Sequence, residues 1–263
     1  MIEMENVSFS TGSTEVRGLS FRLGRKEKAV VLGPRFSGKS DLLLVCLGAH
    51  PYSDGTVRLF GQTLDMAGRG LPPDLAQKVG FVGKNSTLLD NLTVSANVGL
   101  PLSYHTGLSA RETADKIGPL LERFEITKAG ELFPHQISDA EVKLAMMARA
   151  LVFDPEILLI DEPTNGDLDP NSFVKILRTM NSEDMKDVSL LVTTSSPSVA
   201  TMEGAASYCM VDGALIPRSE LGRVHNVAVD DFMGVVNDYS ERQANGVRPF
   251  YAGLGPSGKR GTT

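Results

Sequence analysis

Gly33-Pro34-Arg35-Phe36-Ser37-Gly38-Lys39-Ser40 has the spacing G-x-x-x-x-G-K-[ST] of a phosphate-binding loop. An apolar run at residues 29–32 precedes it, and residues 41–47 have the character of a helix start, so strand, loop and helix follow in the order this motif requires. The two glycines let backbone N–H groups point inward, and the helix N-terminus adds partial positive charge. These flanks disfavour a chance glycine-rich turn and predict a phosphate site.

The residues of this loop have separate predicted tasks. Lys39 is expected to reach the β- and γ-phosphates of a nucleotide, and the Ser40 hydroxyl to complete the coordination shell of a Mg²⁺ ion. Asp41, the first residue beyond the motif, is counted with the loop as nucleotide-binding.

Composition limits the other classes of function. With 263 residues, the chain is long enough for one large α/β domain or two small ones. The net charge of −6 argues against general nucleic-acid binding, and the basic cluster at residues 22–28 reads as a solvated turn. Cys46 and Cys209 stand among core-like residues and are predicted to be reduced. Because no apolar run approaches the roughly 20 residues of a membrane span, we expect a soluble, cytoplasmic protein.

Hydrophobic periodicity predicts the remaining elements. The predicted strands are residues 2–9, 16–23, 29–32, 55–60, 79–82, 157–160 and 189–193, with hairpins at the first pair and over residues 206–216. The predicted helices are residues 94–102, 110–124, 139–153, 172–180 and 227–239, with Ser109 and Ser138 as N-caps.

This order of elements predicts an α/β fold. We expect a P-loop NTPase core, with a mixed and mainly parallel sheet, an antiparallel β subdomain and a helical insert. A nucleotide-binding domain is predicted over residues 1–239, with its helical subdomain at about residues 85–155. Residues 240–263 are rich in Gly and Pro and are expected to form an extended or disordered C-terminal tail.

A second group of chemical residues follows a buried strand. Asp161 and Glu162 stand at the carboxyl end of the predicted strand 157–160, and ligands of open parallel sheets bind beyond such ends. Asp161 is predicted to hold Mg²⁺, directly or through water, and Glu162 to act as the general base that polarises the attacking water. Alone, such an acid pair is commonly structural. Because the same sequence also contains a phosphate loop, a catalytic role is favoured.

These residues, with Pro163-Thr164 after them and the helix that begins at Ser138, resemble the ATP-binding cassette (ABC) family of transporter ATPases. The resemblance extends from the first hairpin to about residue 238. It implies an ATPase that binds ATP with Mg²⁺ and pairs with a second ATPase subunit, identical or different. It also implies a transmembrane permease that holds the protein at the inner face of the cell membrane.

Several family positions differ in this sequence. The aromatic residue that stacks on adenine corresponds to Ser10-Thr11, the metal-sensing glutamine to Lys84, and the histidine after the strand 189–193 to Thr194, followed by Ser195. The signature segment, which faces the opposite nucleotide, reads Ile137-Ser138-Asp139-Ala140-Glu141 in place of Leu-Ser-Gly-Gly-Gln. The interface loop at residues 165–169 is one residue longer than usual.

Because each altered element normally positions nucleotide or stabilises the transition state, the resemblance implies ATP binding with weak or partner-dependent hydrolysis. The alternative is a non-hydrolytic, degenerate cassette in which ATP acts as a regulatory or structural clamp. A small-molecule P-loop kinase is disfavoured, because such enzymes need neither the Ser138 helix nor this acidic strand.

A finer resemblance involves two short segments. Residues 97–102 with 104–106, and the tail residues 245–251, are similar to the ATPase subunits of Mce-type (Mla) phospholipid transporters. This similarity implies lipid transport and makes Phe250 and Tyr251 interface anchors; the alternative is a generic importer-like cassette with an inert tail. The apolar residues Leu88, Leu89, Leu92 and Val94 either line a groove for the permease or pack the core of the insert.

Overall fold

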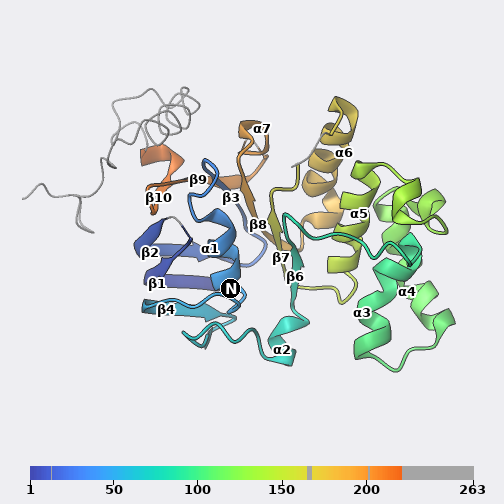
Figure 1. Ribbon diagram of the computed structural model, residues 1–263, viewed down its shortest axis with the longest axis horizontal. Helices are drawn as coiled ribbons and strands as arrows, with labels where there is room; N and C mark the ends of the chain where they lie inside the picture. Colours follow the sequence, from blue (N-terminus) through green and yellow to red (C-terminus); the bar gives the residue numbers. More distant parts are fainter. Residues whose placement is uncertain (13, 165–167, 201, 221–263) are drawn as a thin grey trace, which may run out of the picture. The chain divides into compact units, whose positions relative to one another are not determined.

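The structure is a computed structural model that describes residues 1–220 except 13, 165–167 and 201 (Figure 1). The chain divides into two compact units. The first comprises Met1–Leu23, Val30–Leu71 and Ala206–Thr263, and the second Gly24–Ala29 and Pro72–Ala205. The predicted helix at 227–239, the tail at 240–263 and much of the interface loop lie outside the described residues.

The first unit contains an antiparallel sheet whose strands run in the order β2-β1-β4-β5. Its strands are β1 (Ile2–Ser10), β2 (Glu15–Leu23), β4 (Asp54–Leu59) and β5 (Gln62–Thr63). β1 pairs with β2 from Ile2 opposite Leu23 to Ser10 opposite Glu15. Apolar side chains on alternate residues of β2 are buried, which is the pattern of a sheet packed on one face. This confirms the predicted hairpin and the antiparallel β subdomain.

The first unit also holds the strands around the phosphate loop. β3 (Lys28–Leu32) leads into the loop and α1 (Lys39–Cys46) leaves it, while β9 (Ala205–Val211) lies between β3 and β10 (Ala214–Pro217). The hairpin of β9 and β10 turns at Asp212 and Gly213, with φ angles of 50° and 75°. Positive φ at both turn residues is typical of two-residue hairpins. A Cβ on Gly213 would lie 2.1 Å from the Glu15 carbonyl oxygen, so glycine is required there.

The second unit contains a parallel sheet with strands in the order β8-β7-β6. These are β6 (Val79–Val82), β7 (Ile157–Asp161) and β8 (Ser189–Thr194), and every residue of β7 and β8 is buried. A continuous apolar run buried on both faces is the signature of a central parallel strand. The predicted strands are therefore confirmed.

Helices make up most of the rest of the second unit (Figure 1). The longer ones are α3 (Val94–His105), α4 (Ala110–Arg123), α5 (Asp139–Ala150) and α6 (Pro170–Asn181). Ser109 and Ser138 cap α4 and α5 as predicted, whereas α6 begins before the predicted residue 172 because Asp169 caps it. The short helices not predicted are α2 (Pro73–Ala76), α7 (Pro197–Ala200) and the 3-10 turns η1 (Thr127–Ala129), η2 (Pro134–Gln136) and η3 (Glu183–Met185).

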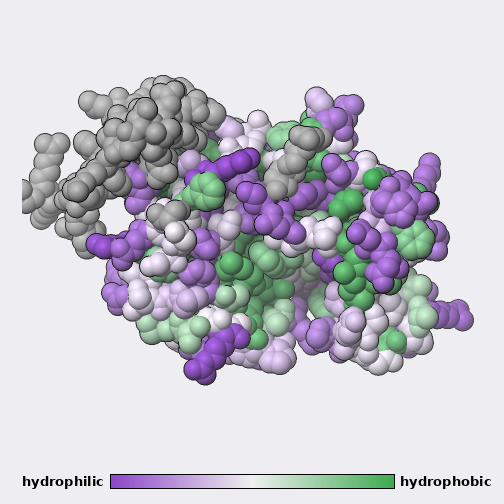
Figure 2. Space-filling model, in the orientation of Figure 1, coloured by the Kyte–Doolittle hydropathy of each residue, from purple (hydrophilic) through white to green (hydrophobic). Residues whose placement is uncertain are grey.

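The insert buries only part of its predicted apolar group. Leu88 and Val94 are buried, Leu92 is half-buried and Leu89 remains 46% exposed. On the face shown in Figure 2, hydrophilic and hydrophobic residues are interspersed over the helices of this unit. Leu88 and Val94 therefore pack in the core, whereas Leu89 lies at the surface.

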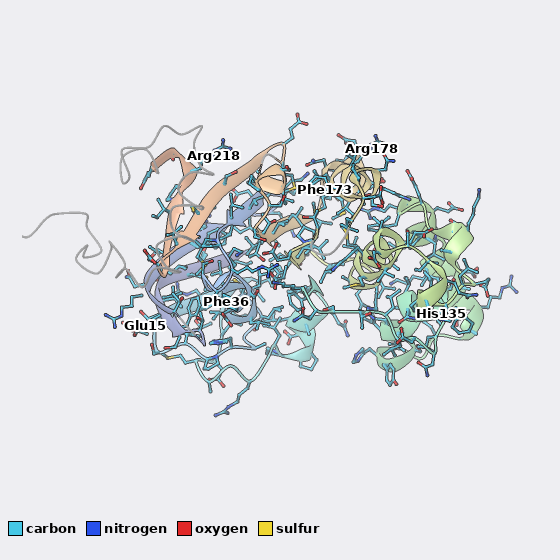
Figure 3. All side chains as sticks on the ribbon, turned by 45° about the horizontal axis from the view of Figure 1, so that its top comes forward. Glu15, Phe36, His135, Phe173, Arg178 and Arg218 are labelled. Atoms are coloured by element: carbon cyan, nitrogen blue, oxygen red, sulfur yellow. The ribbon has the colours of Figure 1, made fainter. Side chains whose placement is uncertain are left out.

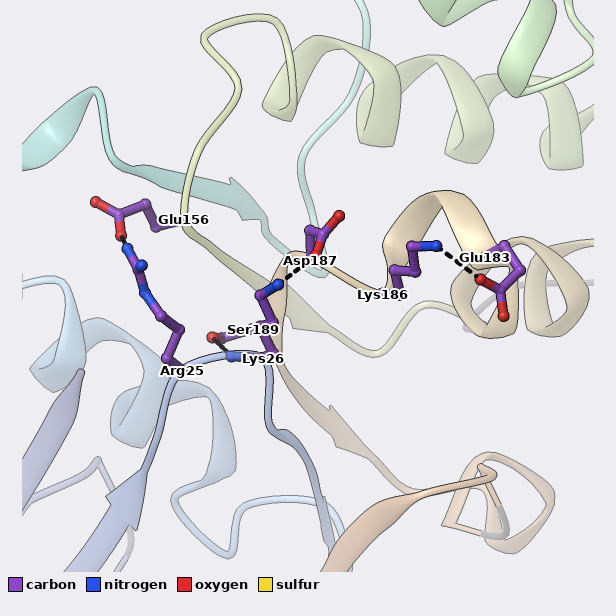
Figure 4. A network of polar contacts seen from close by, with 7 residues as sticks. All are labelled: Arg25, Lys26, Glu156, Glu183, Lys186, Asp187 and Ser189. Carbon is purple, nitrogen blue, oxygen red and sulfur yellow. Dashed lines mark hydrogen bonds and ion pairs between the residues drawn. The ribbon is translucent and has the colours of Figure 1, made fainter.

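Of the basic cluster at residues 22–28, Arg25 and Lys26 lie in a turn and form ion pairs (Figure 4), whereas the ends of the cluster belong to β2 and β3. Arg25 pairs with Glu156, and the Lys26 ammonium lies 2.6 Å from a carboxylate oxygen of Asp187. The Lys26 backbone N–H also donates to the Ser189 hydroxyl at 2.8 Å. Exposed pairs of this kind contribute little to stability, so the backbone contact is the more important tie.

The two cysteines are buried and free, as predicted. Burial raises the pKa of both the Cys46 and the Cys209 thiol to about 12. Thiols with such high pKa values are poor nucleophiles at neutral pH, and both residues act as small apolar groups.

Candidate functional site

The phosphate loop depends on glycine at both ends. A Cβ on Gly33 would lie 2.4 Å from the Met210 carbonyl oxygen and 2.9 Å from the Ser37 Oγ. Gly38 has φ +95°, and a Cβ there would meet side chains of Thr11, Val16 and Met210 at 3.0–3.3 Å. These constraints explain why the motif has glycine at these positions: the backbone passes too close to β9 and the first hairpin for a side chain.

Two observations in the loop fit a bound phosphate. Gly38 is the N-cap of α1 and supplies no side-chain hydrogen bond, so no side chain caps this helix end. The Ser37 Oγ is buried, and among the described residues it has no hydrogen-bond partner. Buried polar atoms are normally paired, and an unpaired hydroxyl beside an uncapped helix N-terminus suits an anionic ligand.

Lys39 is 5% exposed and folds back over the loop. Its ammonium donates to the carbonyl oxygens of Gly33 at 2.8 Å and Pro34 at 2.7 Å. These bonds hold the positive charge against the loop backbone, where the sequence predicted a phosphate contact. At the start of α1, Ser40 is half-buried, and an Asp41 carboxylate oxygen lies 3.7 Å from the His50 Nε2.

The centre of the loop is bulky and strained. Phe36 has φ +65° and a ring that is 77% exposed (Figure 3). Left-handed backbone at an aromatic residue is unfavourable and needs support from its surroundings. The Thr14 hydroxyl donates to the Phe36 carbonyl at 3.0 Å, and Thr11 in the same turn accepts from the Thr14 N–H at 2.9 Å. Thr11 thus organises the hairpin end beside the loop rather than presenting an aromatic face.

In the second unit, the acidic strand end is held by the neighbouring strand. Asp161 lies opposite Thr193 in the parallel register of β7 and β8, and the Thr193 Oγ1 donates to the Asp161 Oδ1 at 2.6 Å. Both side chains are buried. The register fixes the direction of this carboxylate, which a short, buried hydrogen bond then holds.

Glu162 lies just beyond the strand with a strained backbone, φ +50°, and 5% exposure. Its N–H donates to the Thr193 carbonyl at 2.8 Å. Its Oε2 accepts two hydrogen bonds from Ser195, one from the backbone N–H at 2.9 Å and one from the hydroxyl at 3.1 Å. Sequence reasoning missed Thr193 and Ser195 as partners, although aligning the parallel strands would have placed Thr193 opposite Asp161.

Two residues that differ from the family pattern, Thr194 and Lys84, lie at the ends of strands. Thr194 is fully buried, and its Oγ1 accepts from the Ser196 N–H at 3.0 Å, so it supports the turn after β8. Lys84 follows β6 and is half-buried.

The signature segment lies at the N-terminus of α5, where Ser138 and Glu141 form a capping box. The Ser138 Oγ donates to the Glu141 Oε2 at 2.7 Å, and the Glu141 N–H donates back to the Ser138 Oγ at 3.3 Å. Hydrogen bonds from Ser138 lower the pKa of Glu141, so it is anionic at neutral pH. Asp139 is exposed in the first turn and Ala140 is buried. This helix end therefore carries its own negative charge.

The described residues contain no group of three or more acidic, His or Cys side chains that would hold a metal ion unaided. Mg²⁺ usually takes only one or two carboxylates from the protein and the rest of its ligands from nucleotide phosphates and water. One serine hydroxyl and one buried carboxylate would therefore be enough protein ligands for Mg²⁺.

A phosphate loop between a strand and a helix, with an acidic strand end in the same chain, defines the class of P-loop nucleoside triphosphatases. Residues 16–165, more than half of the chain, match the family model described as ABC transporter. The chain belongs to the ABC transporter family.

Relatives and solved structures agree with this assignment. The methionine import ATP-binding protein MetN of Clostridium acetobutylicum is 30% identical over 235 residues, covering 86% of this chain and 70% of the relative. The glutamate transport ATP-binding protein GluA of Corynebacterium glutamicum is 29% identical over 221 residues, covering 84% and 90%. The ATP-binding cassette MJ0796, solved as a dimer bound to ADP and Pi, is 25% identical with a TM-score of 0.68, covering 82% and 96%.

A second solved structure, of lower sequence identity, extends the comparison of the fold only. The structure of cbiO1 from Clostridium perfringens, described as part of the ABC transporter complex cbiONQ, has a TM-score of 0.72 at 21% identity and covers 93% of this chain and 97% of cbiO1. These matches confirm the α/β cassette fold and the predicted class. The chain is an ATP-binding subunit of an ABC transporter, an ATPase that uses ATP with Mg²⁺.

Proposed function

We propose that residues 33–41 bind the phosphates of ATP at a dimer interface, that Ser40 and Asp161 hold Mg²⁺, and that Glu162 is the general base. Bound there, Mg²⁺ would neutralise part of the negative charge of the nucleotide phosphates. Lys39 would offset negative charge on the γ-phosphoryl group while this group is transferred to water and ADP departs. The observation that carries the proposal is Glu162, because a buried carboxylate in a strained conformation is costly to retain without a task.

Turnover by this chain is proposed to be weak or dependent on partners. Lys84 cannot ligate a metal as a glutamine oxygen does, and Thr194 is committed to the turn after β8. In the dimer, the signature residues Ser138, Asp139, Ala140 and Glu141 would face the nucleotide of the opposite subunit. Two carboxylates there repel the γ-phosphate that they face, which slows both sites of a pair of identical chains and only the partner's site in a pair of different chains.

The proposed assembly is a pair of ATPase subunits, identical or different, on a transmembrane permease. Support comes from the dimer described for MJ0796 and the transporter complex described for cbiO1. No described helix is long and apolar enough to cross a membrane, which suits attachment through a permease at the inner face. We propose domain bounds of 1–239 for the cassette, about 85–155 for its helical subdomain and 240–263 for a C-terminal extension.

The test of coupling is phosphate release from Mg-ATP by the chain alone and with its permease. We expect slow release by the isolated chain and at least about a tenfold rise in the complex, because the partner completes the positioning of the catalytic groups. Equal rates in both states would contradict partner-dependent hydrolysis.

Phospholipid is the proposed cargo, on the resemblance of residues 97–102 and 245–251 to Mla-type ATPases. Two relatives are named for the transport of methionine and of glutamate, so these amino acids are the alternative cargoes to test. In the reconstituted complex, we expect phospholipid to stimulate phosphate release. Methionine and glutamate should leave the rate unchanged. Stimulation by an amino acid alone would contradict the lipid assignment.

A second candidate is an ATP-dependent clamp without hydrolysis, favoured by the anionic helix end at Ser138 and Glu141. It predicts that Mg-ATP stabilises or dimerises the chain with no phosphate release in any assembly. Steady release that Glu162→Gln abolishes would count against the clamp.

A further inference from the structure

We infer that Ser195, the residue after the position where Thr194 replaces the family histidine, is the positioning residue for the general base Glu162. The inference rests on the proposed function of Glu162. Both donors of Ser195, its backbone N–H and its hydroxyl, converge on the same oxygen, Oε2, at 2.9 and 3.1 Å.

This arrangement fixes a carboxylate through one of its two oxygens. A carboxylate is planar with two oxygens, so two hydrogen bonds that hold Oε2 in place also restrict the direction in which Oε1 points. A general base needs that remaining oxygen at a defined place relative to the attacking water. Two donors from one residue define this direction better than either donor alone.

The backbone of Glu162 is also held by the neighbouring strand β8. Glu162 has φ +50°, a conformation that is unfavourable for a residue with a side chain, and its N–H is tied to the Thr193 carbonyl at 2.8 Å. The main chain is thus held by β8, and the side chain is held by the residue that follows β8. The end of β8 therefore orients Glu162 at both the backbone and the carboxylate.

Ser195 differs from its neighbours in what its side chain does. Thr193 bonds to Asp161, and Thr194 accepts from the Ser196 N–H. Ser195 is exposed, so replacing its hydroxyl by hydrogen leaves no buried cavity and should leave the fold intact.

The test compares Ser195→Ala, Ser195→Thr and the neighbouring control Ser196→Ala in the chain assembled with its permease. For Ser195→Ala we expect kcat to fall on the order of 10- to 100-fold, with KM for ATP within about twofold of wild type, because orientation of the base affects only the chemical step. Ser195→Thr keeps the hydroxyl and should recover most of the rate. Ser196→Ala should resemble wild type, since the hydrogen bonds described for Ser196 run through its backbone.

A double mutant separates action through Glu162 from an independent effect. Adding Ser195→Ala to Glu162→Gln should lower the residual rate little further, because the group that Ser195 orients is already disabled. A wild-type rate in Ser195→Ala, or the same fold-loss in both backgrounds, would overturn the inference. No phosphate release by wild type, or an unchanged rate in Glu162→Gln, would instead overturn the proposed function on which it rests.

Discussion

Thr193 donates a 2.6 Å hydrogen bond to Asp161 across two parallel strands, and both side chains are buried. The two residues are direct partners in the register of β7 and β8. A polar pair at this depth has few alternative partners, so the strand alignment itself determines where the proposed magnesium ligand points.

Replacing Thr193 by Val should therefore lower both the free energy of unfolding and the Mg²⁺-dependent affinity for ATP. The change keeps the shape but leaves a buried carboxylate with one donor fewer, which typically costs about 1–3 kcal/mol of unfolding free energy. Urea denaturation measures this loss, and titration with ATP at varied Mg²⁺ measures the second effect. Thr193→Ser retains the hydroxyl and is the control; equal losses in both variants would contradict a role for the hydrogen bond.

A side chain at Gly38 should destabilise the phosphate loop. Gly38→Ala places a Cβ at φ +95° within 3.0–3.3 Å of three side chains, whereas a Cβ on Gly12 would meet nothing within 4 Å. We expect Gly38→Ala to lose roughly 1–2 kcal/mol of unfolding free energy and Gly12→Ala to lose little. Chemical denaturation of both variants checks the contrast, and similar stabilities would show that the backbone constraint is absent.

Ser138→Ala should weaken α5 in a pH-dependent way. Loss of an N-cap costs about 1 kcal/mol. Ser138 lowers the pKa of Glu141 in the folded chain, so the stabilisation from this hydrogen-bonded pair is fully present above the ordinary carboxyl pKa. It is lost as pH falls through the lowered pKa of the folded chain. The stability difference between wild type and Ser138→Ala should thus shrink between pH 7 and about pH 3.

The matched control for Ser138 is Ser109, which forms the same capping box with Glu112 at the start of α4. Ser109→Ala should also weaken its helix but leave phosphate release unchanged. By contrast, Ser138→Ala should lower phosphate release as well, because Ser138 belongs to the signature segment. Equal losses of phosphate release in both variants would instead show that a weaker helix alone explains the effect.

Lys39→Met should weaken nucleotide binding while keeping the fold. Charge-assisted hydrogen bonds are worth roughly 1.5–3 kcal/mol, so we expect ATP affinity to fall on the order of 10- to 100-fold, as measured by calorimetry. Lys186→Met, which removes an exposed lysine paired with Glu183, is the control. An unchanged affinity in Lys39→Met would contradict the phosphate role of the loop.

Sequence reasoning predicted the elements well where the pattern is local. The loop at residues 33–40, the caps at Ser109 and Ser138 and the hairpin over residues 206–216 each depend on residues close in sequence, and the structure has each of them. The helix α6 was placed too late because Asp169 was interpreted as part of the interface loop rather than as an N-cap.

The partners of the acidic residues could not be predicted in the same way. Ser195 is 33 residues from Glu162, and Thr193 is 32 from Asp161. Such contacts follow from strand register, which a single sequence specifies only through burial patterns. The phosphate loop, by contrast, carries its own geometry in its glycines.

Phosphate release from saturating Mg-ATP by the assembled complex tests the central claim most directly. With Glu162→Gln we predict a loss of at least about 100-fold in the rate, as for removal of a positioned general base, while equilibrium ATP binding persists. The exposed Glu183→Gln variant should keep the wild-type rate. Equal phosphate release by wild type and Glu162→Gln would contradict the assignment of Glu162 as the catalytic base.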